Sequence, residues 1–590
     1  MCGIFALLNT NNNDNLNNSI IKEQFDKGKR RGPEYSKLDF DYMKMILGFH
    51  RLAINGLNME SNQPIVFNDI VLICNGEIYN YKQLYNYMGV KPITDSDCEV
   101  IIHLYLKYGI EQTLVMLDGV YSFILYDNRL NESITNNIYI ARDPLGVRPL
   151  YKLYNIADKL NHLYGFASEL KCLEHFYNRF YYRTEVEQFK PGTYSVFQHG
   201  SKVQSRWEPI INNKQYYIPT FSSTTLILDT DYYKNQLYTK ISSELAMATF
   251  KRCKATERPV ACLLSGGLDS SLIAALVADY FRKEGKQIET YSIGLINSED
   301  IKYARIVADY IGSKHNEIIV SENEMFDAIP EVIQAIESYD ITTVRASIGN
   351  YLIGKYISTN SDAKVIFNGD GSDELFGGYL YMNKCPDDIE FDKETRRLLK
   401  DIHLFDVLRS DKSISSNGLE PRTPFLDRNF VNIILSINPY FRNHNNFREP
   451  EKYLLRNSFT NFYYRDFTGR QILPDKILFR KKEAFSDGVS NQGRSLFTIL
   501  QEKISQKLNK EQEERQLFSH PEHDKCFIEF KPNIETEKMY YFNLFNKYYP
   551  NCQHIVPYFW MPKYTNATDP SARTLDVYKP DDVKSNYESV

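Results

Sequence analysis

The first residue of this 590-residue chain whose position suggests chemistry is Cys2, directly after Met1. A small side chain at position two favours removal of Met1, which would leave Cys2 with a free α-amine beside its thiol. Because the ordinary pKa of an α-amine is about 7.7–8, this amine could carry the thiol proton near neutral pH. Taken alone, Cys2 is more simply explained as a small residue at the start of a strand, so the chemical interpretation depends on partners elsewhere.

Three later segments supply groups that suit amide hydrolysis at a cysteine. Arg51 ends an expected strand and could bind a carboxylate through two hydrogen bonds. The side-chain amide of Asn75 and the backbone N–H of Gly76 could stabilise a tetrahedral oxyanion. Asp97, at the start of an expected helix, could face a substrate ammonium. Together these groups predict cleavage of the side-chain amide of a free amino acid.

A second candidate site is the loop Ser-Gly-Gly-Leu-Asp-Ser-Ser at residues 265–271, which follows an expected strand at 259–264. Its two glycines allow close backbone approach, and a helix N-terminus with serine hydroxyls binds anions such as phosphate. Asp269 could hold Mg²⁺ against a leaving pyrophosphate. The loop lacks the Gly-Lys-Ser/Thr ending of a Walker A motif, so it predicts a different nucleotide site, with a plain Gly-rich turn as the alternative.

Six motifs up to residue 171 resemble the class II glutamine amidotransferases, which have an α+β, N-terminal-nucleophile αββα sandwich fold. They are Cys2-Gly3-Ile4, Arg31-Gly32-Pro33, His-Arg-Leu-Ala-Ile at 50–54, Asn-Gly-Glu-Ile-Tyr-Asn at 75–80, Ala-Arg-Asp-Pro-Leu-Gly at 141–146 and Ala-Ser-Glu-Leu-Lys at 167–171. The resemblance implies Cys2 as nucleophile, with Asn75 and Gly76 as the oxyanion hole. The glutamine-binding residues that it implies are Arg51, Leu52, Ala53, Ile54, Asn55, Asn75, Gly76, Glu77 and Asp97. Glu34 replaces the usual Asp, a conservative change that we expect to be structural.

The 265–271 loop resembles that of the ATP pyrophosphatases, which transfer AMP to an oxygen acceptor and do not move the γ-phosphate. With ordered segments at 291–295, 339–347, 368–379, 419–427, 480–489 and 566–573, the chain resembles the glutamine-hydrolysing asparagine synthetases up to about Lys579. The ATP-binding residues that this resemblance implies are Leu264, Ser265, Gly266, Gly267, Asp269, Ser270, Ile293, Asn368 and Gly369. It also implies that Asp269 and Asp373 hold Mg²⁺, that Asp370 and Lys482 are catalytic, and that residues 339–347 form the acceptor-binding loop.

The resemblance implies a reaction in two halves. Glutamine hydrolysis at Cys2 supplies ammonia, while ATP adenylates the β-carboxylate of aspartate and Lys482 stabilises the charge that develops on the α-phosphate. Ammonia then attacks the β-aspartyl-AMP to give asparagine, AMP and pyrophosphate. Ammonia is mostly protonated in water at pH 7, and the resemblance therefore also implies a sheltered tunnel between the two sites.

The acidic turn departs from this pattern at two positions. The family usually has Ser-Gly-Glu-Gly-Ser-Asp-Glu, whereas this chain has Asn368 and Asp370 in place of the Ser and the first Glu. Asp370 is one methylene shorter, and an offset of about 1 Å can cost on the order of 100-fold in rate. We expect a slower enzyme, and the alternatives are a catalytically impaired glutamine- or nucleotide-binding regulator, or another adenylating amidotransferase such as a β-lactam-forming synthetase, although those relatives typically lack the nucleophilic Cys2.

The elements that must position these groups change in kind along the chain. Short β-branched and aromatic runs at 46–49, 70–74, 120–126 and 138–141 predict stacked antiparallel sheets, and 99–108 predicts a helix. From about Leu237, strands at 259–264 and 289–293 alternate with helices at 270–282 and 301–311, which predicts an α/β parallel sheet. We expect a polar linker at 207–225 and a solvated loop in the Asn-rich run 9–18. The predicted units are 1–210, 211–563 and a C-terminal tail at 564–590.

Composition excludes several classes of protein. The formal net charge of −5, with 25% charged residues, provides no basic surface for nucleic acid. No apolar run approaches the ~18 residues that a membrane span needs, and no basic leader precedes the first apolar run. Nine cysteines without a Cys-x-x-Cys pair favour a reducing compartment, and we expect a cytoplasmic protein. The expected partners are glutamine, aspartate and ATP, with a homodimer as one possibility.

Overall fold

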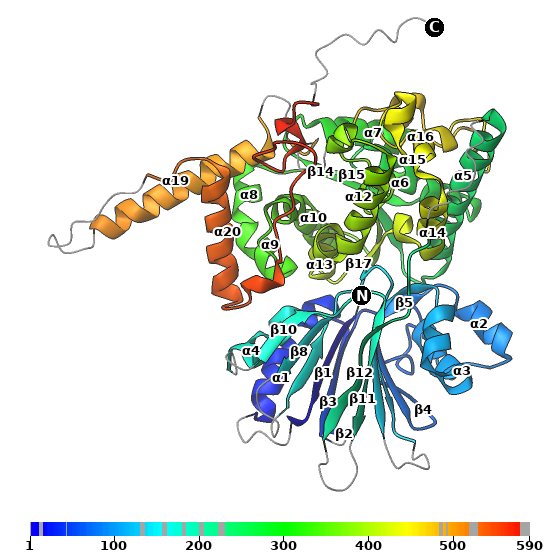
Figure 1. Ribbon diagram of the computed structural model, residues 1–590, viewed down its shortest axis with the longest axis vertical. Helices are drawn as coiled ribbons and strands as arrows, with labels where there is room; N and C mark the ends of the chain where they lie inside the picture. Colours follow the sequence, from blue (N-terminus) through cyan, green and yellow to red (C-terminus); the bar gives the residue numbers. More distant parts are fainter. Residues whose placement is uncertain are drawn as a thin grey trace, which may run out of the picture.

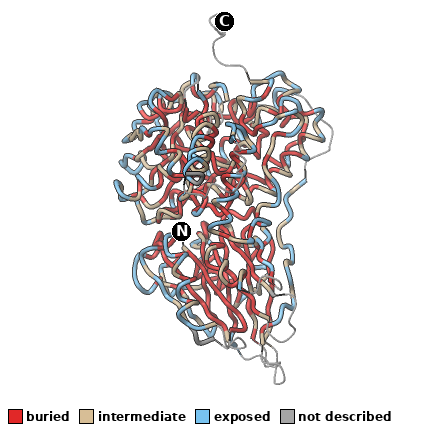
Figure 2. The backbone as a smooth tube through the Cα atoms, turned by 90° about the vertical axis from the view of Figure 1, so that its left-hand side faces the viewer, coloured by how far each residue is buried: buried red, intermediate tan, exposed pale blue. Residues whose placement is uncertain are grey.

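A computed structural model describes most of the chain in two parts that meet near the N-terminus (Figures 1 and 2). The described residues are 2–10, 16–42, 44–129, 136–155, 162–179, 184–199, 206–221, 230–482, 488–490, 494–517 and 529–578. The lower part in Figure 1 consists mainly of strands, and the upper part is built around a sheet surrounded by helices.

The N-terminal part is a sandwich of two six-stranded antiparallel sheets with helices on its outer faces (Figure 1). One sheet has the order β10 (Thr184–Gln188), β8 (Tyr151–Asn155), β9 (Tyr164–Ala167), β1 (Gly3–Leu8), β3 (Met45–Arg51), β2 (Tyr35–Tyr42). The other has the order β12 (Trp207–Gln215), β11 (Thr193–His199), β7 (Asn137–Arg142), β6 (Gly119–Asp127), β5 (Ile70–Ile78), β4 (Ile65–Phe67). The helices are α1 (Asn18–Asp26), α2 (Tyr81–Met88), α3 (Val100–Met116) and α4 (Glu174–Arg179). This is the αββα arrangement that the sequence predicts.

Strand β1 shows why both faces of its sheet are buried. Ile4 and Ala6 point into the layer between the two sheets, where they pack with β5, β6 and β7. Phe5 and Leu7 point the other way, onto the apolar faces of α1 and α4. Side chains alternate along a strand, so an unbroken apolar run such as this one fills two layers at once.

The segment 207–225 differs from the linker that we expected, because Trp207–Gln215 forms strand β12. Trp207 is fully buried, and its backbone N–H donates to Oδ1 of Asn9 at 2.8 Å. Asn9 is itself buried, so the expectation of a solvated loop fails for this residue, while residues 11–15 lie outside the described part. The polar residues of β12 belong to an edge strand that leaves much of its surface exposed, which explains why composition suggested a linker.

The C-terminal part contains the predicted parallel sheet, with the order β15 (Lys314–Ile319), β14 (Glu289–Gly294), β13 (Val260–Leu263), β16 (Val365–Phe367), β17 (Glu420–Arg422). The helices expected between its strands are α6 (Leu268–Lys283) and α7 (Glu299–Ile311). The other main helices are α5 (Asp231–Lys254), α8 (Glu322–Asp327), α9 (Ile329–Ile336), α10 (Ile341–Asn360), α11 (Ser372–Phe376), α12 (Asp388–Asp401), α13 (Asp406–Ser415), α14 (Arg428–Ser436), α15 (Pro439–Arg442), α16 (Tyr453–Ser458), α17 (Asp475–Leu478), α19 (Leu496–Leu517) and α20 (Ile534–Tyr548).

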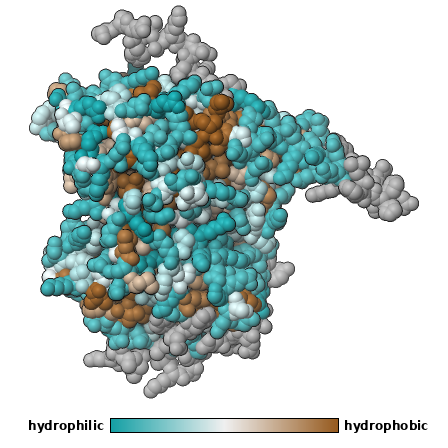
Figure 3. Space-filling model, turned by 180° about the vertical axis from the view of Figure 1, so that it is seen from behind, coloured by the Kyte–Doolittle hydropathy of each residue, from teal (hydrophilic) through white to brown (hydrophobic). Residues whose placement is uncertain are grey.

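Residues 564–578, the first part of the predicted C-terminal tail, pack against the C-terminal part. Leu575 is buried, and Asp569 forms an ion pair with Arg345 of α10 at 2.7 Å. Residues 579–590 lie outside the described part. Among the described residues no helix is long and apolar enough to cross a membrane. The face seen from behind is largely hydrophilic, with separate apolar patches (Figure 3).

Candidate functional site

Strand alternation brings Cys2 and Asn75 together between the two sheets. Cys2 precedes β1 two residues before Ile4, and Asn75 follows Ile73 of β5 at the same two-residue spacing, so both face the layer between the sheets. The backbone N–H of Cys2 donates to Oδ1 of Asn75 at 3.2 Å. Two residues that are 73 positions apart in the sequence thus form one site, as the sequence predicts.

The Cys2 thiol needs a base before it can act as a nucleophile. Its Sγ lies 3.7 Å from the carbonyl oxygen of Leu52. Burial raises the pKa of the thiol to about 11, so it is protonated near neutral pH. To act as the predicted nucleophile, Cys2 would therefore require a proton acceptor close to the sulfur.

Packing fixes the two residues predicted for the oxyanion hole. Nδ2 of Asn75 donates to Oγ of Ser168 at 3.4 Å, and this hydroxyl also accepts from the backbone N–H of Ile4 at 3.1 Å. A Cβ on Gly76 would lie 2.5 Å from the carbonyl oxygen of Val120 and 2.7 Å from Cα of Tyr121. Only glycine therefore allows β5 to approach β6 this closely beside the thiol.

Arg51 lies at this site, and its guanidinium is surrounded by acceptors from the loop that follows β3. Nη1 donates to the carbonyl oxygen of Asn58 at 2.9 Å and to Oδ1 of Asn62 at 2.6 Å. Nη2 donates to the carbonyl oxygens of Asn55 and Gly56. A substrate carboxylate would have to replace some of these acceptors, so the predicted role of Arg51 requires a rearrangement of the loop.

Two buried carboxyl groups occupy the positions predicted for binding an ammonium. Oε2 of Glu77 accepts from Nδ2 of Asn55 at 2.7 Å and lies 3.4 Å from Nη2 of Arg422 in the C-terminal part. Oδ2 of Asp97 accepts from the backbone N–H of Ile78 at 2.7 Å. Burial raises the pKa of Asp97 to about 6, and burial together with the charge of Asp97 raises the pKa of Glu77. A bound cation would favour the charged form of both groups.

The remaining predicted glutamine contacts, at residues 52–55, lie where the two parts of the protein meet. The carbonyl oxygen of Ile54 accepts from the backbone N–H of Glu257 at 3.1 Å, and that of Ala53 accepts from Nε of Arg258 at 2.8 Å. Glu34 bonds to the backbone N–H of Ala53 and to Nη2 of Arg258, each at 2.7 Å. Glu34 thus has the structural role that we expected.

The second candidate site is a cavity of about 210 Å³ at the carboxyl ends of β13, β14 and β16. Its lining includes most of the predicted nucleotide, metal and catalytic residues: Leu264, Ser265, Gly267, Asp269, Ser270, Ile293, Asn368, Gly369, Asp370, Asp373 and Lys482. Gly266 has a φ of 73°, and a Cβ there would lie 2.5 Å from the backbone of Tyr303 and Ala304. The glycine therefore lets the loop pass close to α7.

Hydrogen bonds from its own serine hydroxyl groups order the loop before α6. Oγ of Ser265 and Oγ of Ser270 lie 2.9 Å apart, and the backbone N–H of Gly267 donates to Oγ of Ser265 at 3.3 Å. A Cβ on Gly369 would lie 2.7 Å from the backbone of Asp269. The two Gly-rich loops thus meet backbone to backbone at the helix N-terminus, where phosphate groups are favoured.

Lysine residues neutralise the two carboxylates that were predicted to hold Mg²⁺. Nζ of Lys452 lies 2.6 Å from Oδ2 of Asp269 and 2.7 Å from Oδ1 of Asp373. Lys482 contacts both oxygens of Asp373, at 2.6 and 2.8 Å. Although burial opposes it, these two lysines hold the pKa of Asp373 below its usual range. Lys452, just before α16, belongs to no motif in the sequence, so sequence analysis missed it.

The position of the Lys452 ammonium allows a test of whether Mg²⁺ fits between these carboxylates. One cation already contacts an oxygen of Asp269 and an oxygen of Asp373, so the two groups converge on a common point. Carboxylate oxygens beside a phosphate site are the ligands that Mg²⁺ usually takes, with water and phosphate completing its shell. The residues therefore fit Mg²⁺, although the described residues hold no cluster of three or more such ligands.

The acidic turn that departs from the family pattern is attached to α13. Nδ2 of Asn368 donates to Oγ of Ser410 at 2.7 Å, and Nη2 of Arg409 donates to Oδ1 of Asp370 at 3.2 Å. Burial raises the pKa of Asp370. Both substituted residues thus keep polar partners in the cavity wall, and Arg409 and Ser410 join the site although sequence analysis did not identify them.

The expected acceptor-binding loop at 339–347 is instead the start of helix α10, capped by Asp340, whose Oδ2 accepts from the backbone N–H of Thr343 at 2.9 Å. Arg345 lies in this helix, where it is buried and paired with Glu537 at 2.6 Å. Thr342 lines the cavity, and no hydrogen bond is made by its buried Oγ1 in the described structure. Thr342 and Ala346 line the cavity from this segment, and Thr342 is the one of the two with a polar side chain.

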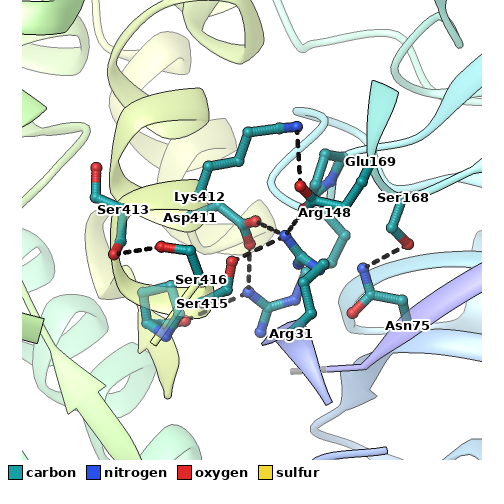
Figure 4. A network of polar contacts seen from close by, with 12 residues as sticks. Arg31, Asn75, Arg148, Ser168, Glu169, Asp411, Lys412, Ser413, Ser415 and Ser416 are labelled. Carbon is teal, nitrogen blue, oxygen red and sulfur yellow. Dashed lines mark hydrogen bonds and ion pairs between the residues drawn. The ribbon is translucent and has the colours of Figure 1, made fainter. Parts of the chain in front are cut away.

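A buried polar network lies between the two sites (Figure 4). Nε of Arg31 donates to the carbonyl oxygen of Cys2 at 3.0 Å, and Nη1 donates to Oε1 of Glu169 at 2.8 Å and to Oδ2 of Asp411 in α13 at 2.7 Å. Oδ1 of Asp411 accepts from Nη1 of Arg148 at 3.2 Å. These contacts connect the backbone of Cys2 to the helix that borders the second site.

Comparison with known proteins matches both parts of the chain. Residues 1–202 match a glutamine amidotransferase domain, and residues 240–387 and 383–533 match asparagine synthase. Over 98% of its length the chain is similar to asparagine synthetase (glutamine-hydrolyzing) of Gallus gallus at 39% identity and of Homo sapiens at 37%, in each case over 99% of the relative. A solved NMN synthetase from Francisella tularensis covers 40% of this chain and 95% of its own, at 13% identity and a TM-score of 0.19, too low to support a conclusion.

Proposed function

Since the chain belongs to the family of glutamine-hydrolysing asparagine synthetases, we propose that it makes asparagine from aspartate, with glutamine as nitrogen donor and ATP as energy source. The products are asparagine, glutamate, AMP and pyrophosphate. The presence of two sites in one chain, Cys2 beside Asn75 and a separate nucleotide-type cavity, supports this proposal most directly.

In the first half-reaction, we assign Cys2 as the nucleophile, with its own α-amine as base once Met1 is removed. The thiol sulfur attacks the side-chain carbonyl carbon of glutamine, and Asn75 and Gly76 stabilise the oxyanion. Ammonia leaves, and water hydrolyses the thioester to release glutamate. Arg51 binds the α-carboxylate of glutamine, and Glu77 and Asp97 bind its α-ammonium.

In the second half-reaction, the β-carboxylate of aspartate attacks the α-phosphorus of ATP and pyrophosphate leaves. The loop at 265–270, with Ile293, Asn368 and Gly369, binds the nucleotide, and Lys482 stabilises negative charge on the α-phosphate. We assign Thr342 to contact the aspartate and Asp370, which lines the same cavity, to a catalytic role. Mg²⁺, held by Asp269 and Asp373, would neutralise charge on the pyrophosphate. Ammonia then attacks the acyl carbon and AMP leaves.

We propose two catalytic units, close to 1–210 and 211–563. Because strand β12 continues to Gln215, a boundary after that residue keeps the strand within the first unit. The cytoplasmic location and the homodimer remain predictions. The eight cysteines within the described residues are all free thiols, which agrees with the reducing compartment that the sequence favours.

The proposal is tested by incubating the protein with aspartate, MgATP and either glutamine or ammonium, and by measuring asparagine, AMP and pyrophosphate. We expect all three products with both donors. The Cys2→Ser variant should keep the ammonium-dependent reaction and lose the glutamine-dependent one about 10³-fold or more, because the attacking thiolate is gone. ADP in place of AMP would contradict adenylation, and nucleotide binding without any product would favour a regulator.

A further inference from the structure

Helix α13 borders the nucleotide cavity and also contacts the N-terminal part beside Cys2. Its residues Arg409 and Ser410 contact Asp370 and Asn368 in the wall of the nucleotide cavity. The next residue, Asp411, contacts Arg31 of the N-terminal part. Successive helix residues point about 100° apart, so one short helix can present different faces to two sites at once.

The N-terminal end of this connection reaches the backbone of Cys2. Asp411 and Ser415 lie one helical turn apart on the same face, and both accept from Nη1 of Arg31, at 2.7 and 2.9 Å. Nε of the same guanidinium donates to the carbonyl oxygen of Cys2 at 3.0 Å. Arg31 and Asp411 are each no more than 2% exposed, so water does not compete for these bonds.

Further buried ion pairs prevent α13 from moving independently of the N-terminal part. Lys412 pairs with Glu337, whose carboxylate also accepts from the backbone N–H groups of Leu170 and Lys171, at 2.8 and 3.0 Å. Packed, buried elements tend to shift as rigid units, so a displacement of the acidic turn reaches this interface.

We infer that α13 couples the two reactions and that Asp411 is its positioning residue, holding Arg31 and through it the backbone of the nucleophile. The inference rests on the proposed function. Binding of ATP and aspartate engages Asp370 and Asn368, which fixes Arg409, Ser410 and the helix that follows them. Asp411 then holds Arg31 in the position that supports Cys2, and glutamine is hydrolysed faster when ammonia can be used.

The measurement is the ratio of glutaminase kcat/KM with ATP and aspartate to its value without them. We expect a ratio of at least about fivefold in the unaltered protein, the lower end of typical couplings between sites. In Asp411→Asn, which keeps the shape of the side chain but removes its charge, the ratio should approach one. Ammonium-dependent synthesis should stay within twofold, a result that a merely structural role would not produce.

Two further variants keep the test decisive. Ser415→Ala removes an uncharged acceptor from Arg31 and should lower the ratio by a smaller factor, even where Asp411→Asn fails to fold. Glu331→Gln is the control, because this exposed residue pairs with Lys355 near the interface and, among the described residues, no hydrogen bond or ion pair joins it to Arg31 or α13. Any one of three results would overturn the inference. They are a ratio of one in the unaltered protein, a normal ratio in both α13 variants, and a parallel loss of both donor-dependent activities. Absence of asparagine from the unaltered protein with ammonium would instead reject the proposed function.

Discussion

At the scale of single residues, the glutaminase site combines a protonated thiol with two carboxyl groups that are costly to ionise. Burial raises the pKa of Cys2 to about 11 and that of Asp97 to about 6. Near neutral pH the thiol is therefore protonated, whereas the Asp97 carboxyl is mostly ionised and becomes neutral only below about pH 6. On the proposed function, the thiol needs a base, and the α-ammonium of glutamine would further favour the charged form of the carboxyl groups.

Asp97 predicts a pH dependence for glutamine binding. Above about pH 6 its carboxylate is ionised and attracts the α-ammonium of glutamine, and below that pH it is protonated and neutral. The Kd for glutamine should therefore rise as the pH falls through 6, approaching about tenfold per pH unit. Calorimetry on Cys2→Ser, which binds without turnover, measures this directly. In Asp97→Asn the Kd for glutamine should be high at every pH and should not rise further as the pH falls through 6. If the Kd of this variant still rose, another group would be responsible.

We predict a large effect on AMP formation when Lys452, which lies outside the motifs found in the sequence, is substituted. It is the shared cation of Asp269 and Asp373. Lys452→Met should leave Asp269 without its lysine partner, while Asp373 keeps Lys482, and should lower the ammonium-dependent formation of AMP by about 100-fold or more. Lys393→Met, an exposed lysine on α12, is the control. Unchanged AMP formation in Lys452→Met would mean that the lysine only fills space.

At the scale of elements, the close pairing of β5 with β6 should make Gly76 intolerant of any side chain. Gly76→Ala places a Cβ 2.5 Å from the carbonyl oxygen of Val120, so the strands must separate. We expect a loss of stability of about 1–3 kcal/mol, measured from denaturant midpoints. Glutaminase activity should fall about 100-fold because the oxyanion donors move away from the thiol. Ammonium-dependent synthesis is the internal control, and its equal loss would point to global misfolding.

The sequence predicts elements well where periodicity and motif agree. The strand–loop–helix expected around residues 265–271 is found as β13, the loop and α6, and the motifs at Cys2 and Asn75 lie side by side in the structure. Prediction fails for β12, whose polar residues are tolerated because the strand lies at an edge. The prediction of an acceptor-binding loop at 339–347 also missed the buried position of Arg345. Its partner Glu537 is 192 positions away, and no local sequence pattern indicates such a pairing.

At the scale of the whole molecule, the modest net charge of −5 conceals a strongly charged interior. Glu77 pairs with Arg422, and Arg31 with Asp411, across the junction between the two parts. Buried pairs of this kind add little net stability but are costly to break singly, so they specify how the parts fit together. The contact between the two catalytic parts is therefore a specific polar interface, in keeping with sites that must act in sequence.

A polar network around Asp569 holds residues 564–578, the end of the described chain, against the C-terminal part. Asp569 pairs with Arg345 at 2.7 Å and accepts from Gln501 at 3.2 Å, while Ala572 lines the nucleotide cavity. A chain ending at residue 563 loses these contacts and leaves Arg345 paired with Glu537 alone.

We expect the chain of residues 1–563 to lose about 3 kcal/mol of unfolding free energy, since a partner is removed from a buried ionic network. Ammonium-dependent synthesis should fall at least tenfold because the cavity loses Ala572 from its lining and Arg345 loses a partner, while basal glutaminase activity persists in the separate sandwich. The chain of residues 1–578 is the matched control and should behave as the full chain does. Asp569→Asn isolates the ionic contribution, because it keeps every backbone contact of the segment. Equal thermal stability and synthesis in the two truncated chains would show that residues 564–578 only cover the surface.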